Sequence, residues 1–373
     1  MPTREAYATL VYGDGPLACA AAVLGRTLRQ HDASRDRIAI VKDLLPETRA
    51  ILEQDGTWKI HSSQRHARRG SGSPRYQAAL ARKNTLWRLP YERVLYLDAD
   101  TFLLPDPDGK KGWRAARLNA LWQRFPLDGM RGRGGAQLAA TGIRPNFYRN
   151  LSSLANTCFN GGFLLLRPDA TTAQRLDGID PHLARQRPER ATGRRCPGFD
   201  QPLLNAAFPP GSWQRIDATT WRSVTHWMAS PEEPSTCALN RRQHLLKRAD
   251  AYHFFHKANP WENIYCALCV QSGFRCRPVV PSTQECPIQA LAQQLWWRLL
   301  MNQLPDNATA SCLKHTEQIF EDARGPLGSR PREARLRAGL CTGCANRPTP
   351  ACSTDWDGRA GRTTANMAGR LLT

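Results

Sequence analysis

The sequence lacks any apolar run long enough to cross a membrane as a helix. No stretch of its 373 residues approaches about 18 consecutive apolar residues. Residues 1–6 also lack the charged-then-apolar pattern of a secretion signal. We therefore expect a cytoplasmic protein with no transmembrane segment, or a Golgi or secretory protein if the N-terminus is incomplete.

Acidic residues are scarce relative to basic ones. The chain has 32 Asp and Glu against 52 Lys and Arg, which gives a formal charge of +20. Such a charge permits nucleic acid, an anionic membrane or phosphate-bearing ligands as partners. Two arginine-rich stretches, 65–75 and 185–195, also contain Gly, Pro or Ser and have no interleaved aromatic residues. We interpret them as solvated loops, so nucleic acid is not an expected partner.

The first forty residues lack a dinucleotide-binding fingerprint but begin like a nucleotide-binding fold. Residues 7–11 are apolar and β-prone, 12–16 (Tyr-Gly-Asp-Gly-Pro) interrupt the strand, and apolar residues recur at helical spacing over 17–28. Without a G-x-G-x-x-G pattern, the turn is either an ordinary strand-to-helix turn or a nucleotide contact. Similar patterns alternate further along, which predicts an α/β fold with a largely parallel sheet. Strands are expected at 38–41, 58–60, 93–97 and 163–168, helices at 46–54, 78–89 and 113–125, and an edge strand at 136–140.

Asp98 and Asp100 follow the apolar strand 93–97. Side chains two residues apart in a strand point to the same side, so the two carboxylates are expected to face one ligand. Paired hard oxygen ligands suit a divalent cation that also holds a diphosphate. The alternative is a pair of acidic residues that only close the strand, because Asp-x-Asp is frequent by chance. Ligands of parallel sheets bind beyond the carboxyl ends of strands, where this pair falls.

Three later segments offer further polar groups. Asn160 precedes two glycines and either binds a ligand hydroxyl or forms a turn. Asp200, followed by Gln201, begins a predicted helix and is either its N-cap or a carboxylate near a reactive sugar carbon. His253 lies in a predicted strand, where histidine is usually structural, but an imidazole would complete a two-carboxylate manganese site.

Six segments in one order resemble glycosyltransferase family 8, the glycogenin-like retaining transferases with a GT-A fold. The similarity extends over residues 7–261 and is looser over 106–150. The segments are 8–12 with 23–28, then 83–87, 97–101, 159–162, 200–201, and 253–254 with 260–261.

The resemblance implies a retaining, metal-dependent hexosyltransferase that uses a UDP-sugar and Mn²⁺ or another divalent cation. Asp98, Asp100 and His253 would be the metal ligands. The catalytic residues would be Asp200, Gln201 and Lys83. The donor-binding residues would be Leu10, Val11, Tyr12, Lys83, Asp98, Ala99, Asp100, Asn160, Gly161 and Lys257. The acceptor is left open among glycan, protein, inositol and lipid, and so is a homodimer.

Three positions depart from the family pattern. Gly161 stands where the family usually has Ser, and His256 stands where it usually has Gly. Asn259 occupies the position of a lysine that normally meets the diphosphate. Lys257 would replace that lysine only if the loop bends differently.

The expected domain organisation is a transferase domain, 1–261, with basic insertions near 61–75 and 106–150. A helical, cysteine-containing extension at 262–321 would pack on it, and a tail at 322–373 is expected to be poorly ordered. Nine of the 12 cysteines follow residue 236. The C-x-x-C pairs at 266–269 and 341–344 are further apart than in common zinc sites, so disulfides or free thiols are favoured over zinc.

Two functions from different classes compete. The first is the metal-dependent hexosyltransferase. The alternative is a catalytically inactive, transferase-like basic protein that contacts nucleic acid or an anionic surface. The charge of +20 favours the second function. The presence of Asp98, Asp100 and His253 together favours the first, which we prefer.

Overall fold

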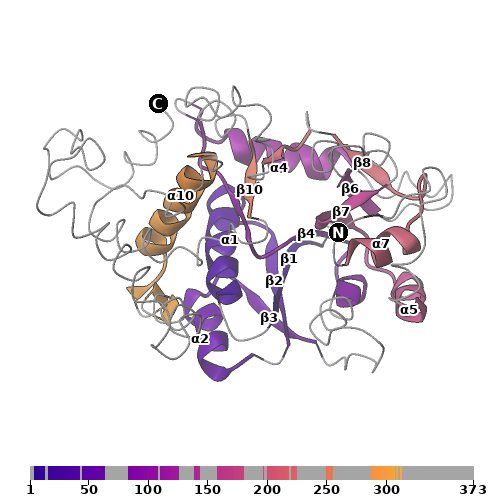
Figure 1. Ribbon diagram of the computed structural model, residues 1–373, viewed down its shortest axis with the longest axis horizontal. Helices are drawn as coiled ribbons and strands as arrows, with labels where there is room; N and C mark the ends of the chain where they lie inside the picture. The colour runs from indigo at the N-terminus through magenta and orange to yellow at the C-terminus, as the bar shows by residue number, and fades with distance from the viewer. Residues whose placement is uncertain are drawn as a thin grey trace, which may run out of the picture.

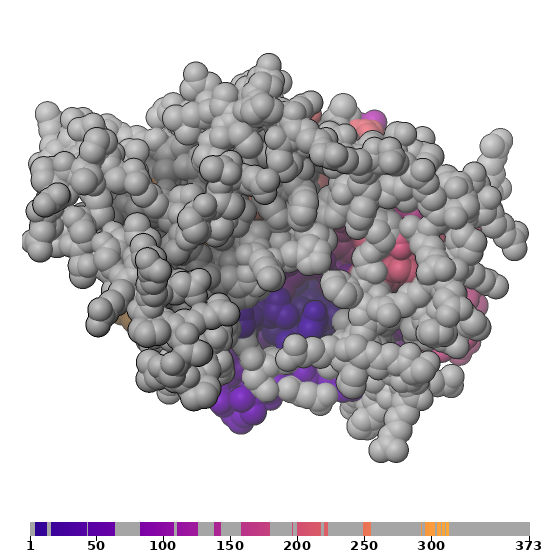
Figure 2. Space-filling model, in the orientation of Figure 1, coloured from indigo at the N-terminus to yellow at the C-terminus, as the bar shows by residue number. Residues whose placement is uncertain are grey.

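A computed structural model gives the structure of the chain, and its centre is a twisted sheet with helices on both faces (Figure 1). The structure describes residues 4–12, 16–42, 44–63, 83–107, 110–125, 138–142, 158–179, 196, 200–217, 220–224, 249–254, 287–306, 308–309 and 311–312. In the same orientation, residues of the N-terminal part, coloured indigo, are visible near the middle of the surface (Figure 2).

Seven strands form the main sheet in the order β3-β2-β1-β4-β7-β6-β8. Neighbouring strands run parallel except at β7, which is antiparallel to both β4 and β6. The predicted α/β class, a mostly parallel sheet flanked by helices, is confirmed. The strands are β1 (Glu5–Tyr12), β2 (Asp36–Lys42), β3 (Lys59–Ser62), β4 (Arg93–Leu97), β6 (Leu138–Gly142), β7 (Phe159–Leu166) and β8 (Gln214–Ile216).

The strand predicted at the edge of the sheet, 136–140, was placed wrongly. It corresponds to β6, which lies between β7 and β8. The short β8 pairs with it in parallel, and Ile216 is the buried residue of β8. A strand of three residues with two exposed positions leaves no apolar run in the sequence, so β8 was not foreseen.

Side chains of the sheet alternate between two apolar cores, as the period of a strand requires. In β1, Tyr7 and Val11 join one core, whereas Ala6, Ala8 and Leu10 join the other. The first core is covered by α1 (Leu17–His31), α2 (Pro46–Asp55), α4 (Trp113–Arg124) and α10 (Pro287–Gln303). The second is covered by the 3-10 helix η1 (Asn84–Arg88), α5 (Ala170–Gly178) and α7 (Gln201–Ala207). Of the helix predicted at 78–89, residues 78–82 lie outside the described part of the chain.

The chain reverses its order in the sheet between β1 and β4. From β1 it passes to β2 and β3 on one side, then returns to β4 on the other. The two strands are tied near their carboxyl ends, where the Thr9 hydroxyl donates to the Leu97 carbonyl at 2.9 Å. In open α/β sheets such a switch point opens a crevice in which ligands bind. Tyr12 ends β1 and Asp98 directly follows β4 on that side.

A second, smaller sheet carries His253. Its strands are β5 (Thr101–Leu103), β10 (Ala251–His253) and β9 (Ser223–Val224), in the order β5-β10-β9. β10 runs antiparallel to β5, and His253 lies opposite Thr101. The buried carboxylate of Asp250 accepts from Arg117 Nε at 2.5 Å and from the Arg222 amide at 2.7 Å. Helix α4 therefore fixes the strand that presents His253.

Helix α10 packs on α1. Trp296, Trp297 and Leu300 are buried in the same core as the residues of α1. A disulfide joins Cys19 of α1 to Cys312, with a Cα–Cα distance of 5.7 Å, and a second joins Cys158 to Cys196. The C-x-x-C cysteines and the segment 322–373 lie outside the described residues. Among the helices that the structure describes, none has the length and apolarity needed to cross a bilayer.

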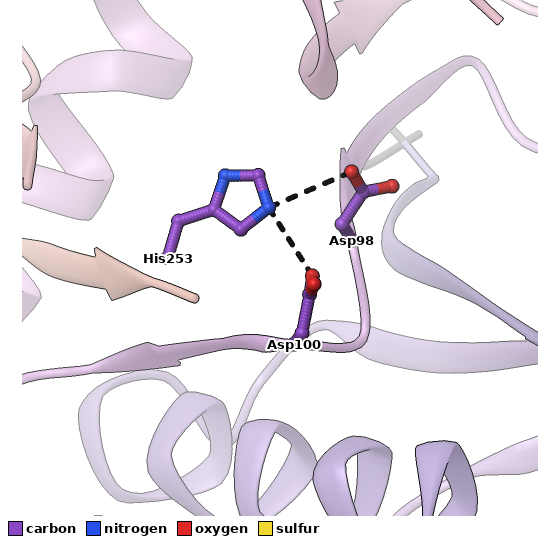
Figure 3. Close-up of side chains that lie close together, drawn as sticks. All are labelled: Asp98, Asp100 and His253. Carbon is purple, nitrogen blue, oxygen red and sulfur yellow. Dashed lines mark ion pairs between the residues drawn. The ribbon is translucent and has the colours of Figure 1, made fainter. Parts of the chain in front are cut away.

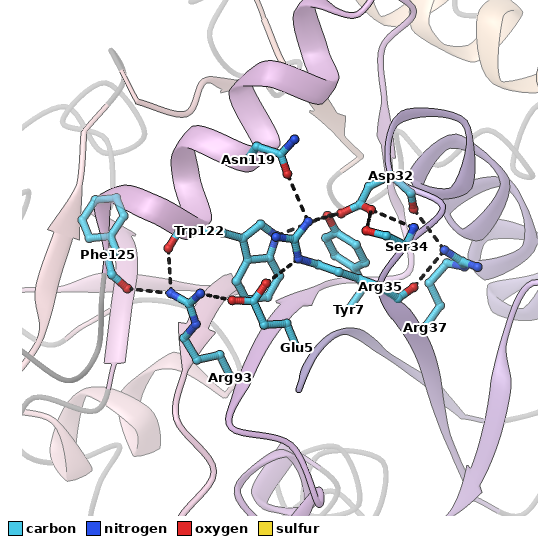
Figure 4. A network of polar contacts seen from close by, with 10 residues as sticks. All are labelled: Glu5, Tyr7, Asp32, Ser34, Arg35, Arg37, Arg93, Asn119, Trp122 and Phe125. Carbon is cyan, nitrogen blue, oxygen red and sulfur yellow. Dashed lines mark hydrogen bonds and ion pairs between the residues drawn. The ribbon is translucent and has the colours of Figure 1, made fainter. Parts of the chain in front are cut away.

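The amino ends of β1 and β4 meet in a polar network, which we call the amino-edge network (Figure 4). Glu5 accepts from both Arg93 and Arg35, and Arg35 also reaches Asp32 at 2.5 Å. The Tyr7 hydroxyl donates to Asp32 at 2.6 Å. Trp122 of α4 lies under the guanidinium of Arg35, 4.9 Å from ring centre to Cζ. Glu5, Asp32, Arg35 and Arg93 thus each have a partner of opposite sign.

Candidate active site

Asp98 and Asp100 lie in the turn that connects β4 to β5. The turn is fixed by backbone hydrogen bonds: the Thr101 amide donates to the Asp98 carbonyl at 3.0 Å, and the Phe254 amide donates to the Asp100 carbonyl at 2.9 Å. The Asp98 amide donates to the Gly162 carbonyl of β7 at 3.0 Å. The two carboxylates therefore leave a rigid turn rather than a regular strand, yet they reach the same space, as expected.

His253 joins the two carboxylates from the small sheet (Figure 3). Its Nε2 lies 3.2 Å from Asp100 Oδ1 and 3.7 Å from Asp98 Oδ2. One ligand atom from each residue lies within 4.8 Å of the others. An imidazole nitrogen and two carboxylate oxygens at this spacing fit a divalent cation of the manganese type. The three residues predicted as metal ligands are thus brought together.

Lys83 is buried next to Asp98, one of the three proposed metal ligands. Its ammonium lies 3.2 Å from Asp98 Oδ1, forms an ion pair with Asp200, and donates to the Gly161 carbonyl at 2.8 Å. It also lies 4.8 Å from the ring centre of Tyr96. The lysine therefore links the proposed metal-binding carboxylate to the carboxylate predicted near the sugar. Lys83, Asp98, Asp100, Asp200 and His253 are hereafter the carboxyl-edge cluster.

Asp200 is the residue before α7, as predicted, but its side chain makes no cap hydrogen bond to the helix. Its carboxylate pairs with Lys83 instead. Gln201 turns toward β7, where its Oε1 accepts from the Gly161 amide at 3.2 Å. Asn205 holds α7 on the same strand by bonding both polar backbone groups of Phe159. The start of α7 is thereby anchored beside the Asn160–Gly162 segment.

The electrostatics of the site follow from burial and from the carboxylates. Burial disfavours the protonated forms of Lys83 and His253, but the negative charges around them outweigh it. Asp200 and Asp98 raise the pKa of Lys83, and Asp100 with Asp98 raises the pKa of His253. Burial and the charge of Asp98 together raise the pKa of the Tyr96 hydroxyl well above its usual value. The carboxylates of Asp200 and Asp98 therefore favour the charged form of Lys83.

The remaining predicted donor-binding residues differ in which of their groups a ligand could contact. The side chains of Leu10 and Val11 are buried in the two cores, so these residues can meet a ligand only through their backbone. Tyr12 is half-buried at the end of β1, and Ala99 is buried between the two aspartates. The Asn160 side chain accepts from the Gly162 amide at 2.6 Å. Lys257 lies outside the described residues.

Two neighbours of the cluster were missed by sequence reasoning. The Tyr96 hydroxyl donates to Asp98 Oδ1 at 2.5 Å and fixes that carboxylate. Its position was readable, because Tyr96 and Asp98 are two residues apart and so share a side of the strand. Gly162 lies against Asp98 and His253, where a Cβ would fall 2.5 Å from Asp98 Oδ2. The resemblance includes Gly162 in the segment 159–162 but gives it no role.

Comparison with known sequences finds glycosyltransferases, while no protein-family model matches the chain. The chain is 24% identical over 322 residues to the putative UDP-glucuronate:xylan alpha-glucuronosyltransferase 3 of Arabidopsis thaliana. That alignment covers 84% of this chain but only 42% of the plant protein. This chain is also 31% identical over 104 residues to inositol phosphorylceramide glucuronosyltransferase 1 of the same plant. That alignment covers 27% of this chain and 19% of the plant protein. These names do not single out the glycogenin-like branch.

Solved structures with a partial likeness are also glycosyltransferases. The galactosyltransferase LgtC, in complex with donor and acceptor sugar analogs, aligns with 82% of this chain and 99% of its own, at 13% identity and a TM-score of 0.45. GlyE of Streptococcus pneumoniae TIGR4 aligns with 87% and 66%, at 17% identity and a TM-score of 0.42.

Proposed function

We propose that the chain is a metal-dependent glycosyltransferase that moves a hexosyl group from a UDP-sugar to an acceptor hydroxyl, with retention of configuration. The observation that carries the proposal is the carboxyl-edge cluster at the sheet's switch point. Its three ligand-type side chains come from two different sheets and converge within 4.8 Å. The sequence relatives support the same reaction class, since each is named as a glycosyltransferase.

The residues divide into two groups along the cluster. Asp98, Asp100 and His253 would hold Mn²⁺ or a similar cation, which would offset the charge of a nucleoside diphosphate as the leaving group. Lys83 adds a fixed positive charge beside them, where negative charge grows in the transition state. Asp200, which pairs with the same Lys83 ammonium as Asp98, has 17% of its side chain exposed and would face the sugar. A carboxylate there stabilises the positive charge that develops on the anomeric carbon.

The donor would bind at the switch point, beyond the carboxyl ends of β1 and β4. Tyr12 at the end of β1 would contact the nucleoside together with the backbone of Leu10 and Val11. Asn160 and Gly161 would border the sugar. UDP-glucuronate is the first donor to test, because the plant relatives are named for it. The inactive basic binding protein is not favoured, since a protein without catalytic function has no need for this converging ligand set.

We also propose that the protein works in an oxidising compartment. The two cysteine pairs join segments that are 293 and 38 residues apart in sequence. Such disulfides persist outside the reducing cytosol. They favour the Golgi or secretory alternative over the cytoplasmic expectation. Mass spectrometry of peptides from unreduced protein should find Cys19 linked to Cys312.

The deciding experiment is a donor panel with purified full-length chain. UDP-glucuronate, UDP-glucose and UDP-galactose are each incubated with Mn²⁺ or with a chelator, and UDP release is measured. We expect release from one donor, dependent on the metal, and loss of it in Asp100→Asn. Release that is equal with chelator and metal would overturn the metal-dependent mechanism. Absence of UDP release and of UDP binding in calorimetry would overturn the transferase assignment.

A further inference from the structure

Two consecutive glycines, Gly161 and Gly162, lie inside β7 where it passes the carboxyl-edge cluster. Glycine inside a strand costs stability, and it commonly marks a close approach by another group. Side chains of neighbouring strand residues point to opposite faces, so a Cβ on each glycine would enter a different space. The two positions therefore report on two separate parts of the site.

The space beside Gly162 belongs to the proposed metal ligands. An added Cβ would lie 2.5 Å from Asp98 Oδ2, 2.8 Å from His253 Cε1 and 3.0 Å from Asn160 Oδ1. Contacts below 3.0 Å do not persist in proteins, so one of the partners has to move. Asp98 Oδ2 and the His253 ring are the groups that face each other across the cluster.

The backbone of Gly162 cannot yield in their place. Its carbonyl accepts from the Asp98 amide at 3.0 Å, and its amide donates to Asn160 Oδ1 at 2.6 Å. The next residue, Phe163, is paired with Leu97 in the ladder between β7 and β4. Asp98 Oδ1 is held by Tyr96 and Lys83, so displacing Oδ2 would strain those contacts too. The displacement therefore falls on Asp98 and His253.

The space beside Gly161 belongs to the other half of the cluster. A Cβ there would lie 3.0 Å from Asp200 Oδ2 and 3.3 Å from Leu204 Cδ1. Neither contact involves Asp98, Asp100 or His253. The approach is also less severe than at Gly162, so a small shift of Asp200 would relieve it.

We propose that Gly162 is a positioning residue of the metal site. Because it has no side chain, Asp98 and His253 can occupy the positions in which both would bind the cation. This inference rests on the proposed function. Gly161 serves as its matched position, because a methyl group there presses on Asp200 instead. The same one-carbon change at adjacent residues should therefore separate metal binding from action on the sugar.

The experiment measures Mn²⁺ binding by calorimetry and by electron paramagnetic resonance, without any donor. Wild type, Gly162→Ala and Gly161→Ala are compared, with thermal unfolding as the check on folding. We expect Gly162→Ala to bind Mn²⁺ roughly 10- to 100-fold more weakly, the cost typical of disturbing the groups that orient metal ligands. Gly161→Ala should bind Mn²⁺ within about twofold of wild type, because its partners are not ligands. Its UDP-sugar turnover should fall.

A second measurement shows whether the effect acts through the histidine. In a His253→Ala background, the Cβ that Gly162→Ala introduces loses one of its two clashing partners. Gly162→Ala should then weaken Mn²⁺ binding less than it does in wild type, which is the non-additivity expected of residues in contact.

The outcomes separate the two claims. If wild type binds no Mn²⁺, the proposed metal-dependent function fails, and the inference fails with it. If wild type binds Mn²⁺ and Gly162→Ala binds it equally well, only the inference is overturned. An unfolded Gly162→Ala protein would also overturn it, because the space would then serve the fold rather than the ligands.

Discussion

Charged residues gather at both ends of the strands of the central sheet, but positive and negative charges are matched only at the amino ends. In the amino-edge network, the carboxylates of Glu5 and Asp32 are matched by the guanidinium groups of Arg35 and Arg93. In the carboxyl-edge cluster, the carboxylates of Asp98, Asp100 and Asp200 share one lysine and one histidine. The first arrangement is complete without a ligand. The second keeps a surplus of negative charge, which a bound cation would remove.

The difference separates stability from function. Partly buried ion pairs hold elements together, and the amino-edge network joins β1, β4, α4 and the end of α1. Like charges held close together oppose folding and persist where a ligand makes use of them. Substitutions at the two edges should therefore have opposite effects on unfolding and on metal binding.

The largest effect is expected from Asp100→Asn in the carboxyl-edge cluster. It removes one proposed ligand, and Mn²⁺ affinity should fall by more than about 100-fold, beyond the usual cost of disturbing a ligand's support. Thermal stability without metal should stay constant or rise, because repulsion with Asp98 is relieved. Calorimetry and thermal unfolding check both parts. Undiminished turnover that still requires Mn²⁺ would remove Asp100 from the site.

The next largest effect is expected in the amino-edge network, where a substitution should lower stability and leave metal binding unchanged. Glu5→Gln leaves Arg35 and Arg93 without their shared anion, and 9% of the Glu5 side chain is exposed. The free energy of unfolding should fall by about 2 kcal/mol, less than for a fully buried pair. Mn²⁺ affinity should not change. Denaturant unfolding measures the loss.

Glu53→Gln is the matched control for that variant. Glu53 pairs with Arg49 on the surface of α2, where 53% of its side chain is exposed. Such pairs contribute roughly 0 to 1 kcal/mol, so this variant should unfold close to wild type. An equal loss in both variants would mean that the amino-edge network is no more than a set of surface pairs.

Acid should act on the amino-edge network through Asp32. Burial opposes its carboxylate, but hydrogen bonds from Ser34, Tyr7 and Arg35 outweigh burial and lower its pKa from 3.8 to about 2. A carboxyl group with a depressed folded-state pKa stabilises the fold above its unfolded value and loses that contribution as the pH falls through the folded value. About 2 kcal/mol should therefore be lost between pH 4 and 2. Asp32→Asn should flatten this part of the stability profile, and an unchanged profile would contradict the assignment.

The sequence predicted the elements whose own residues carry a pattern. Strands β1, β2, β4 and β7 have apolar runs or alternation, and α1, α2 and α4 have helical spacing, so the α/β class was accessible. The strand predicted around His253 corresponds to β10. β5, β8 and β9 were not predicted, because strands of two or three residues hold too few positions to show a period. β6 is an interior strand only because β8 pairs with it. Since β8 was not predicted, the interior position of β6 was missed too.

Contacts between residues far apart in sequence limited how much of the site could be predicted. Asp98 and Asp100 were recognisable from their place after a strand. The pairing of Lys83 with Asp200, 117 positions later, depends on how α7 packs on β7 and has no local signal. The N-cap alternative for Asp200 was reasonable from position alone, yet its side chain makes no cap bond because the buried ammonium competes for it. The disulfide from Cys19 to Cys312 was likewise beyond reach of spacing rules.

Of the two ligand substitutions, His253→Ala is expected to weaken metal binding less than Asp100→Asn. His253 is the proposed ligand that comes from the second sheet. His253→Ala leaves both carboxylates in their turn, and water can replace the imidazole, so we expect Mn²⁺ binding to weaken by about 10-fold, near the lower bound for metal-site changes. Turnover should return when Mn²⁺ is raised by the same factor. His31→Ala is the matched control: His31 is also a buried histidine, but its Nε2 contacts the Leu104 carbonyl at 3.2 Å, on α1 and away from the cluster. That variant should lose stability and keep its Mn²⁺ affinity. If both variants lose stability and neither loses Mn²⁺ affinity, His253 belongs with the structural histidines, and the surplus charge of the carboxyl edge is held by Asp98 and Asp100 alone.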